Sequence, residues 1–80
     1  MRAVVHVHLK HGVLDPQGKA IAHALQGLGF AEAADARVGK VIELDLAETD
    51  PARAEARVRE MCEKLLANTV IESYRVEIAA

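Results

Sequence analysis

The chain has 80 residues, of which 51% are hydrophobic, 28% charged and 2% aromatic, and its formal net charge is −2. This length corresponds to one small domain and excludes a self-sufficient two-domain enzyme. Without tryptophan, with one tyrosine and one phenylalanine, and without a basic cluster, the chain lacks the stacking and charge features of a nucleic-acid-binding protein.

The single cysteine, Cys62, excludes an internal disulfide, and no Cys/His spacing matches a structural zinc site. The amino terminus lacks the features of a signal peptide, and no run approaches the roughly 18 apolar residues that span a membrane. We therefore expect a soluble, cytoplasmic protein that does not bind a membrane.

The first half of the chain predicts a strand and then a helix. Residues 4–9 alternate with a period of two, which is typical of a strand. Asp15 suits the N-cap of a helix and Pro16 its first position, because proline lacks the amide hydrogen that is unpaired there. Apolar side chains then recur at helical spacing at Ile21, Ala24, Leu25 and Leu28. Gly29 suits the left-handed residue that ends a helix.

The second half predicts a hairpin, a helix and a last strand. Residues 34–46 predict two strands around a turn at Gly39 and Lys40. Asp50 and Pro51 repeat the signals of a helix start. The apolar positions of this second helix are Ala54, Val58, Met61, Cys62 and Leu65, and its exposed side carries the pairs Glu55–Arg59 and Glu60–Lys64. Residues 71–78 alternate again and predict a fourth strand.

The order strand, helix, strand, strand, helix, strand predicts a single α+β domain over residues 1–80. Short connections and right-handed crossovers favour a two-layer ferredoxin-like sandwich, in which an antiparallel sheet has both helices on one face. The other face is predicted to carry Val4, His6, His8, Val41, Glu43, Asp45, Arg75 and Glu77. This polar face, and a free edge at the strand beginning at Ile71, favour a component of an assembly.

Each candidate for chemistry has a structural explanation that we favour over the functional one. His6 and His8 lie on one strand face, where a metal could use them, but two imidazoles without a certain carboxylate do not complete a metal site. The helix start at Asp15 could receive a phosphate, but Asp15 itself competes for the amides. Cys62 has no base beside it and lies on the apolar side of its helix, as a packing cysteine does.

Arg37 and Lys40 flank the predicted turn and could reach an anionic ligand or an acidic partner surface. Charged side chains that are simply solvated are an equally good explanation. The chain shows no nucleophile with its base and no complete metal set, so the residues alone predict an assembly-prone α+β domain.

Three segments closely resemble the PurS family, which is the small subunit of phosphoribosylformylglycinamidine (FGAM) synthase. They are residues 9–18 (Leu-Lys-His-Gly-Val-Leu-Asp-Pro-Gln-Gly), the turn Arg37-Val38-Gly39-Lys40, and residues 62–74. The resemblance runs essentially from end to end. One departure is Thr69, where the family often has proline, which affects only the rigidity of that turn.

The resemblance implies a non-catalytic subunit of a glutamine-dependent ligase in purine biosynthesis. In this family a glutaminase subunit, PurQ, releases ammonia, and a large subunit, PurL, uses ATP and Mg²⁺ to convert formylglycinamide ribonucleotide to the amidine. The PurS-type chain is expected to bridge these two subunits, to assist ammonia transfer, to form a homodimer or tetramer, and to hold no cofactor of its own.

The resemblance also implies roles for individual residues, none of them catalytic, metal-binding or cofactor-binding. The expected partner-binding residues are Gln17, Arg37, Lys40, Asn68 and Glu72. The expected structural residues are Gly12, Asp15, Pro16, Gly18 and Gly39.

Two other classes share this topology. An acylphosphatase-like enzyme needs an arginine in the loop after the first strand, and residues 10–18 contain none. A ferredoxin-like regulatory module that binds a small molecule or a metal is the alternative that stays open. Calorimetry with amino acids and divalent metals distinguishes it from a scaffold.

Overall fold

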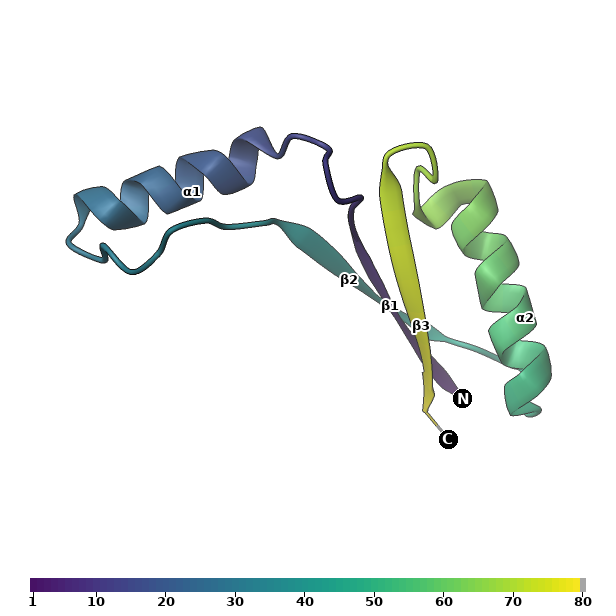
Figure 1. Cartoon of the computed structure of the whole chain (residues 1–80). Helices are drawn as coiled ribbons and strands as arrows, with labels where there is room; N and C mark the ends of the chain where they lie inside the picture. Colours follow the sequence, from purple (N-terminus) through teal and green to yellow (C-terminus); the bar gives the residue numbers. More distant parts are fainter. Residues whose placement is uncertain (80) are drawn as a thin grey trace.

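The structure, a computed structural model that describes residues 1–79, is built on a three-stranded antiparallel sheet (Figure 1). Its strands are β1 (Arg2–Leu9), β2 (Gly39–Asp45) and β3 (Glu72–Ala79), in the order β2-β1-β3. In the central strand, Val5 lies opposite Ile42 on one side and Val76 on the other. The predicted α+β class with an antiparallel sheet is confirmed.

The hydrophobic core lies between one face of this sheet and helix α2 (Pro51–Met61). Val5 and Val7 of β1 are almost fully buried, and they belong to the same apolar cluster as Val58 of α2 and Cys62 directly after it. The Asp50 carboxylate caps α2 by accepting a hydrogen bond from the Ala52 amide at 3.3 Å. The sequence-predicted start of this helix is therefore confirmed.

Helix α2 continues into one π-helical turn, η1 (Cys62–Leu66). This turn shifts which apolar residues face the core. Leu65, predicted to face the core, is 83% exposed, whereas Ala67 is buried. The wider turn places one extra residue per repeat, so the three- and four-residue spacing no longer predicts the buried side. Of the two predicted ion pairs, Glu55–Arg59 forms at 2.9 Å, but Glu60 pairs with Arg57 instead of Lys64.

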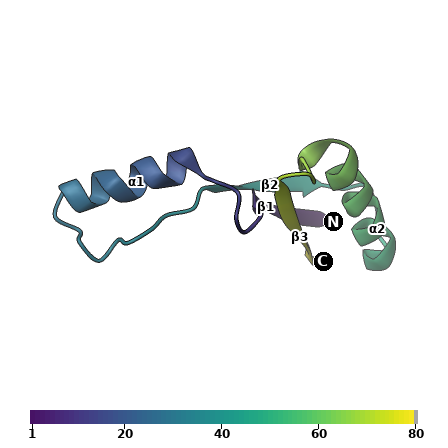
Figure 2. The ribbon, with the colours of Figure 1, turned by 45° about the horizontal axis from the view of Figure 1, so that its top comes forward.

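Helix α1 (Pro16–Gly27) does not lie on the sheet. Together with the segments that lead to and from it, it forms an arm, residues 10–38, that extends away from the sheet on the side opposite α2 (Figures 1 and 2). The partner of α1 is the returning segment, because Gln26 donates a hydrogen bond to the Ala33 carbonyl at 2.9 Å. The prediction that both helices cover one face is therefore wrong.

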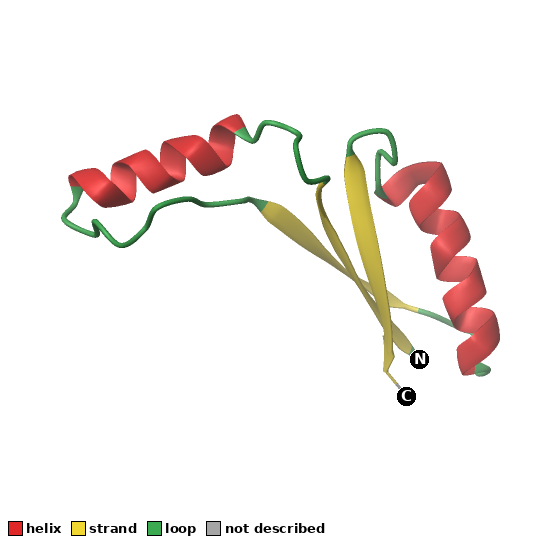
Figure 3. Ribbon diagram, viewed as in Figure 1, coloured by secondary structure: helices red, strands yellow, loops and turns green. Residues whose placement is uncertain are grey.

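The predicted hairpin in residues 34–46 is also wrong, because only the second of its two strands forms (Figure 3). Gly39 and Lys40 are not a turn but the first residues of β2, opposite His8 and Val7 of β1. The residues before β2 contact the start of α1 through their backbone. The Val38 amide donates a hydrogen bond to Asp15, and the Ala36 carbonyl lies against Gly18. The Val38 amide therefore bonds to the outgoing segment of the arm instead of to a neighbouring strand.

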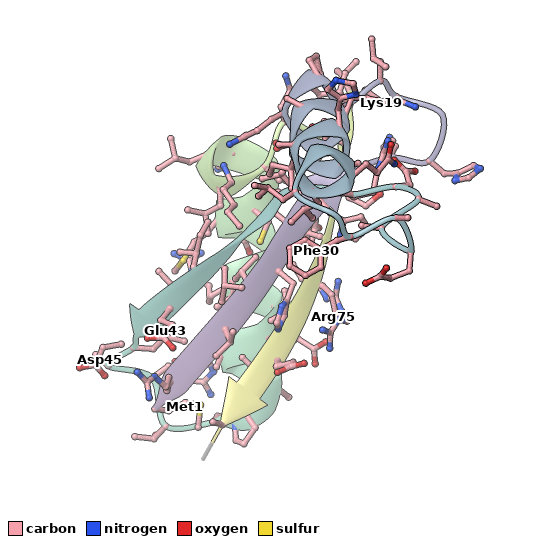
Figure 4. All side chains as sticks on the ribbon, turned by 90° about the vertical axis from the view of Figure 1, so that its left-hand side faces the viewer. Met1, Lys19, Phe30, Glu43, Asp45 and Arg75 are labelled. Carbon is pink, nitrogen blue, oxygen red and sulfur yellow. The ribbon has the colours of Figure 1, made fainter. Side chains whose placement is uncertain are left out.

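The sheet face away from α2, here called the open sheet face, carries the polar residues expected from the alternation. Val4 lies opposite Glu43 and Glu77, and His6 lies opposite Val41 and Arg75. Figure 4 shows Glu43 and Arg75 on the two outer strands of the sheet. β3 is an edge strand, as predicted. Among residues 1–79, no helix is long and apolar enough to cross a membrane.

Candidate functional site

The base of the arm, where residues 10–15 leave the sheet and residues 36–40 return to it, gathers most of the residues expected to bind partners. A cleft of about 330 Å³ lies there beside the end of β1. Three of the five expected partner-binding residues line it: Gln17, Lys40 and Glu72. The sequence places these residues far apart, so their convergence is a consequence of the fold.

Asp15 joins the two segments at the base of the arm. Its carboxylate accepts a hydrogen bond from the Gly18 amide at 2.8 Å, which caps α1, and another from the Val38 amide at 2.7 Å. The side chain is only 4% exposed. The Val38 amide, followed by the Gly18 amide, lowers the pKa of Asp15, so this carboxylate stays ionised. The predicted N-cap of α1 at Asp15 is confirmed, and the amides that Asp15 occupies are closed to a phosphate.

Arg37 makes the reciprocal connection, from the returning segment to the outgoing one. Its guanidinium donates to the Val13 carbonyl at 3.0 Å and to the Lys10 carbonyl at 3.2 Å. Asp15 and Arg37 thus form a double link between the two segments, here called the clasp. No pattern in the sequence indicated this internal role for Arg37, and the contact of Arg37 with a partner stays a prediction.

Three of the glycines lie where a side chain would strain or block the backbone. Gly12 has φ +90°, a conformation that other residues rarely adopt. A Cβ on Gly18 would lie 2.2 Å from the Ala36 carbonyl oxygen, and one on Gly39 would lie 2.7 Å from the Val7 carbonyl oxygen. Gly39 is therefore needed for close approach of β2 to β1, not for the turn that was expected.

Asn68 and Glu72 organise the turn between η1 and β3. The Asn68 amide donates to the Glu72 carboxylate at 2.6 Å, and the Asn68 side-chain oxygen accepts from the Val70 amide at 3.2 Å. Both residues therefore have an internal role, and their contact with partners stays a prediction. The Lys40 ammonium, in contrast, has no hydrogen bond or ion pair within residues 1–79.

The structure offers little support for a metal site or a reactive thiol. His6 Nε2 lies 3.5 Å from a Glu77 carboxylate oxygen on the open sheet face, which is the cross-strand pairing favoured above. Within residues 1–79, no group of three or more metal-ligating side chains occurs. Cys62 is fully buried, and desolvation raises the pKa of its thiol, which disfavours the nucleophilic thiolate.

A model of the PurS family, described as phosphoribosylformylglycinamidine (FGAM) synthase, matches residues 2–80. The chain belongs to this family. Its predicted role as a PurS-type subunit of FGAM synthase in purine biosynthesis is confirmed at that level. One similar protein is the FGAM synthase subunit PurS of Bacillus subtilis, which is 53% identical over 74 residues, 92% of this chain and 87% of the relative.

Solved structures of the family share the fold described above. Methanocaldococcus jannaschii PurS, one of the subunits of formylglycinamide ribonucleotide amidotransferase in the purine biosynthetic pathway, superposes with a TM-score of 0.87 at 39% identity, over 95% of this chain and 92% of that one. A chain in the PurLQS structure from Thermotoga maritima gives 0.87 at 30% identity, over 95% and 93%. The ferredoxin-like α+β character is thus shared across the family, whereas the four-stranded arrangement is not seen here.

Proposed function

We propose that this chain is the non-catalytic connecting subunit of FGAM synthase, which binds the synthetase subunit PurL and the glutaminase subunit PurQ and aligns them for ammonia transfer. The observation that carries the proposal is the family membership together with the Thermotoga maritima structure, whose name places PurS with PurL and PurQ. Free ammonia is protonated or diffuses away in water, so a closed assembly preserves it for the amidation step.

The chemistry of the chain supports a connecting role. Hydrolysis of glutamine at a cysteine requires an accessible thiolate, whereas the single cysteine is buried in the core with a raised pKa. We propose that ATP and Mg²⁺ are used by the large subunit and that this chain supplies binding surfaces only. The residues proposed for partner contact are Gln17, Arg37, Lys40, Asn68 and Glu72.

We also propose that the chain works as a homo-oligomer, with a dimer as its basic unit. The radius of gyration is 16.0 Å, compared with about 12 Å for a compact domain of this length. Much of this extension comes from the arm, on which Leu28 is 74% and Phe30 is 50% exposed. A second copy that covers these side chains would remove their apolar surface from water.

The decisive experiment measures glutamine-dependent formation of the amidine by purified PurL and PurQ, with and without this chain. We expect amidine formation from glutamine to require the chain, and the isolated chain to show neither glutaminase nor ATPase activity. Equal rates in the two mixtures, or turnover by the chain alone, would contradict the proposal.

A further inference from the structure

A second pocket at the base of the arm has a lining in which every polar side chain is basic. It has a volume of about 360 Å³ and is lined by His8, Leu9, His11 and Arg37. His8 and Leu9 end β1, His11 follows in the outgoing loop, and Arg37 comes from the returning segment. The pocket adjoins the cleft described above, with which it shares His8 and Leu9.

Arg37 differs from the other arginines of the chain in its electrostatic environment. The remaining arginines each have a carboxylate within 4.0 Å, namely Arg2, Arg53, Arg57, Arg59 and Arg75. Arg37 has none among residues 1–79, and its two hydrogen bonds are to the neutral carbonyls of Lys10 and Val13. Its guanidinium is therefore fixed in position while its charge lacks a direct counter-ion.

The surroundings of the pocket do not supply the missing anion. Asp15 interacts electrostatically with Arg37, but it forms no ion pair with it within 4.0 Å, and its two carboxylate oxygens accept bonds from the Gly18 and Val38 amides. The Glu72 carboxylate, which lines the adjoining cleft, accepts a bond from the Asn68 amide. Lys10, which follows Leu9 in the chain, and Lys40, which lines the adjoining cleft, add positive charge without an ion pair in the described part of the chain.

We propose that this pocket receives a carboxylate side chain of a partner subunit, with His8, His11 and Arg37 as its ligands. A guanidinium carries five N–H donors, so the two bonds to the loop leave donors for a carboxylate. The proposal rests on the connecting function proposed above and specifies the chemistry of one contact. It also assigns a role to His11, which was not among the residues expected to bind partners.

A side chain of a partner fits this pocket better than a free anion does. Sites for small ligands bury most of the ligand surface, whereas His8, His11 and Arg37 are all exposed and leave the pocket open to solvent. A small anion there would bind weakly. A carboxylate that arrives as part of a larger interface does not need to bind tightly on its own, and it provides orientation and electrostatic steering.

The test introduces negative charge into the pocket and leaves Asp15 and Arg37 of the clasp unchanged. The double variant His8→Glu/His11→Glu places two carboxylates in the pocket, and neither side chain forms a hydrogen bond within residues 1–79. A matched control, His23→Glu, makes the same change at an exposed position of α1 outside the pocket. Circular dichroism and thermal melting verify that the variants are folded.

The readout is the concentration of each variant that gives half-maximal stimulation of glutamine-dependent amidine formation by PurL and PurQ. We expect the double variant to need roughly ten-fold more protein or more, with a weaker dependence on NaCl than the wild type, and His23→Glu to stay within about two-fold. A double variant that stimulates as well as His23→Glu overturns the pocket proposal while the connecting function stands. A wild-type chain that gives no stimulation overturns both.

Inorganic phosphate, titrated into the wild-type chain and followed by NMR, tests the free-anion alternative. Shifts at His8 and His11 that saturate below millimolar phosphate would overturn the assignment to a partner carboxylate. Weak, unsaturated shifts support it.

Discussion

Single residues at the base of the arm determine whether the two segments can approach each other. Gly18 of α1 faces the backbone of Ala36, so any side chain there meets a carbonyl oxygen that cannot move independently. Gly27, at the other end of the same helix, has open space where its Cβ would be. The two glycines therefore provide a matched pair for testing whether contact, and not helix propensity, controls stability.

We predict that Gly18→Ala lowers the free energy of unfolding by about 1–3 kcal/mol, because the new methyl group forces the returning segment away from α1. Gly27→Ala should raise it by about 0.5–1 kcal/mol, since alanine restricts the unfolded chain. Urea denaturation at equal protein concentration measures both changes. Equal effects of the two substitutions would contradict the close approach at Gly18.

Asp15 is predicted to make stability depend on acidic pH. Its pKa is lowered in the folded state, so its contribution is fully present above the unfolded pKa of about 3.9 and disappears as the pH falls through the lower folded value. Asp15→Asn should lower the Tm by about 5 °C or more at pH 7 and by less near pH 2. Glu48 is a second group whose pKa is lowered in the folded state, mainly by the Asp50 amide. The stability of the Asp15→Asn variant therefore still falls in acid, as that of the wild type does. A constant difference in Tm over this range would contradict the prediction.

Lys40 is the expected partner-binding residue whose charge is free of internal bonds, so its substitution should separate binding from folding. We predict that Lys40→Glu weakens co-elution with PurL and PurQ while its circular dichroism spectrum and Tm remain close to those of the wild type. Lys64→Glu makes the same change at an exposed lysine of η1, outside the arm, and provides the control. Unchanged co-elution of the Lys40 variant would count against a docking role.

At the scale of elements, the π-helical turn decides which apolar residues of α2 and η1 enter the core. Val58, one turn before it, is fully buried, whereas Leu65 within it is exposed. Sequence periodicity assigns both to the same apolar stripe. The turn therefore separates two residues that the pattern treats as equivalent.

We predict that Val58→Ala costs about 2 kcal/mol of unfolding free energy, because it removes two buried methyl groups from a core that cannot close around the gap. Leu65→Ala removes more atoms but should change stability by less than about 0.5 kcal/mol. Chemical denaturation of the two variants checks the difference. A larger loss at Leu65 would show that the π turn is not present in solution.

The elements that the sequence predicted well are those whose signals are local. The caps at Asp15 and Asp50 precede proline, and the alternation in residues 4–9 and 72–78 indicates which side chains share a sheet face. The errors concern long-range choices. Residues 34–38 have the alternation of a strand, but the Val38 amide bonds to Asp15 and the Ala34 and Ala36 amides bond to nearby residues. The apolar stripe of α1 does not reveal which surface it meets.

The candidate site was predicted in part for the same reason. The resemblance to the PurS family indicated Gln17, Arg37 and Lys40, but nothing in the spacing brought Arg37 to the carbonyls of Lys10 and Val13, or beside His11. Such convergence depends on two connections of different length that meet at one end of the sheet. It becomes visible only when the chain is folded.

At the scale of the whole molecule, the chain is elongated, with extents of 48 × 26 × 14 Å, because the arm extends away from the sheet whereas α2 covers one sheet face (Figure 1). In a monomer, Leu28 and Phe30 of the arm leave apolar surface exposed to water, which is unfavourable. We therefore predict that Leu28→Lys shifts the chain toward the monomer in sedimentation equilibrium by a ten-fold or larger increase in dissociation constant.

Leu65→Lys introduces the same charge at another exposed leucine, in η1 outside the arm, and should leave the oligomer unchanged. The Tm of the wild type should also rise with protein concentration, because association stabilises the folded state. A wild-type chain that sediments as a monomer at all concentrations would contradict the proposed dimer.

The ladder between β1 and β2 has a consequence for how this family can vary. It closes a loop that contains the whole arm, and the entropy cost of such a loop grows only with the logarithm of its length, by about 0.6 kcal/mol per doubling. Extra turns could therefore be inserted into α1, beyond the clasp, with little penalty for the sheet. The reach of the connector is thus adjustable almost independently of its core, which would let one scaffold serve neighbours of different size.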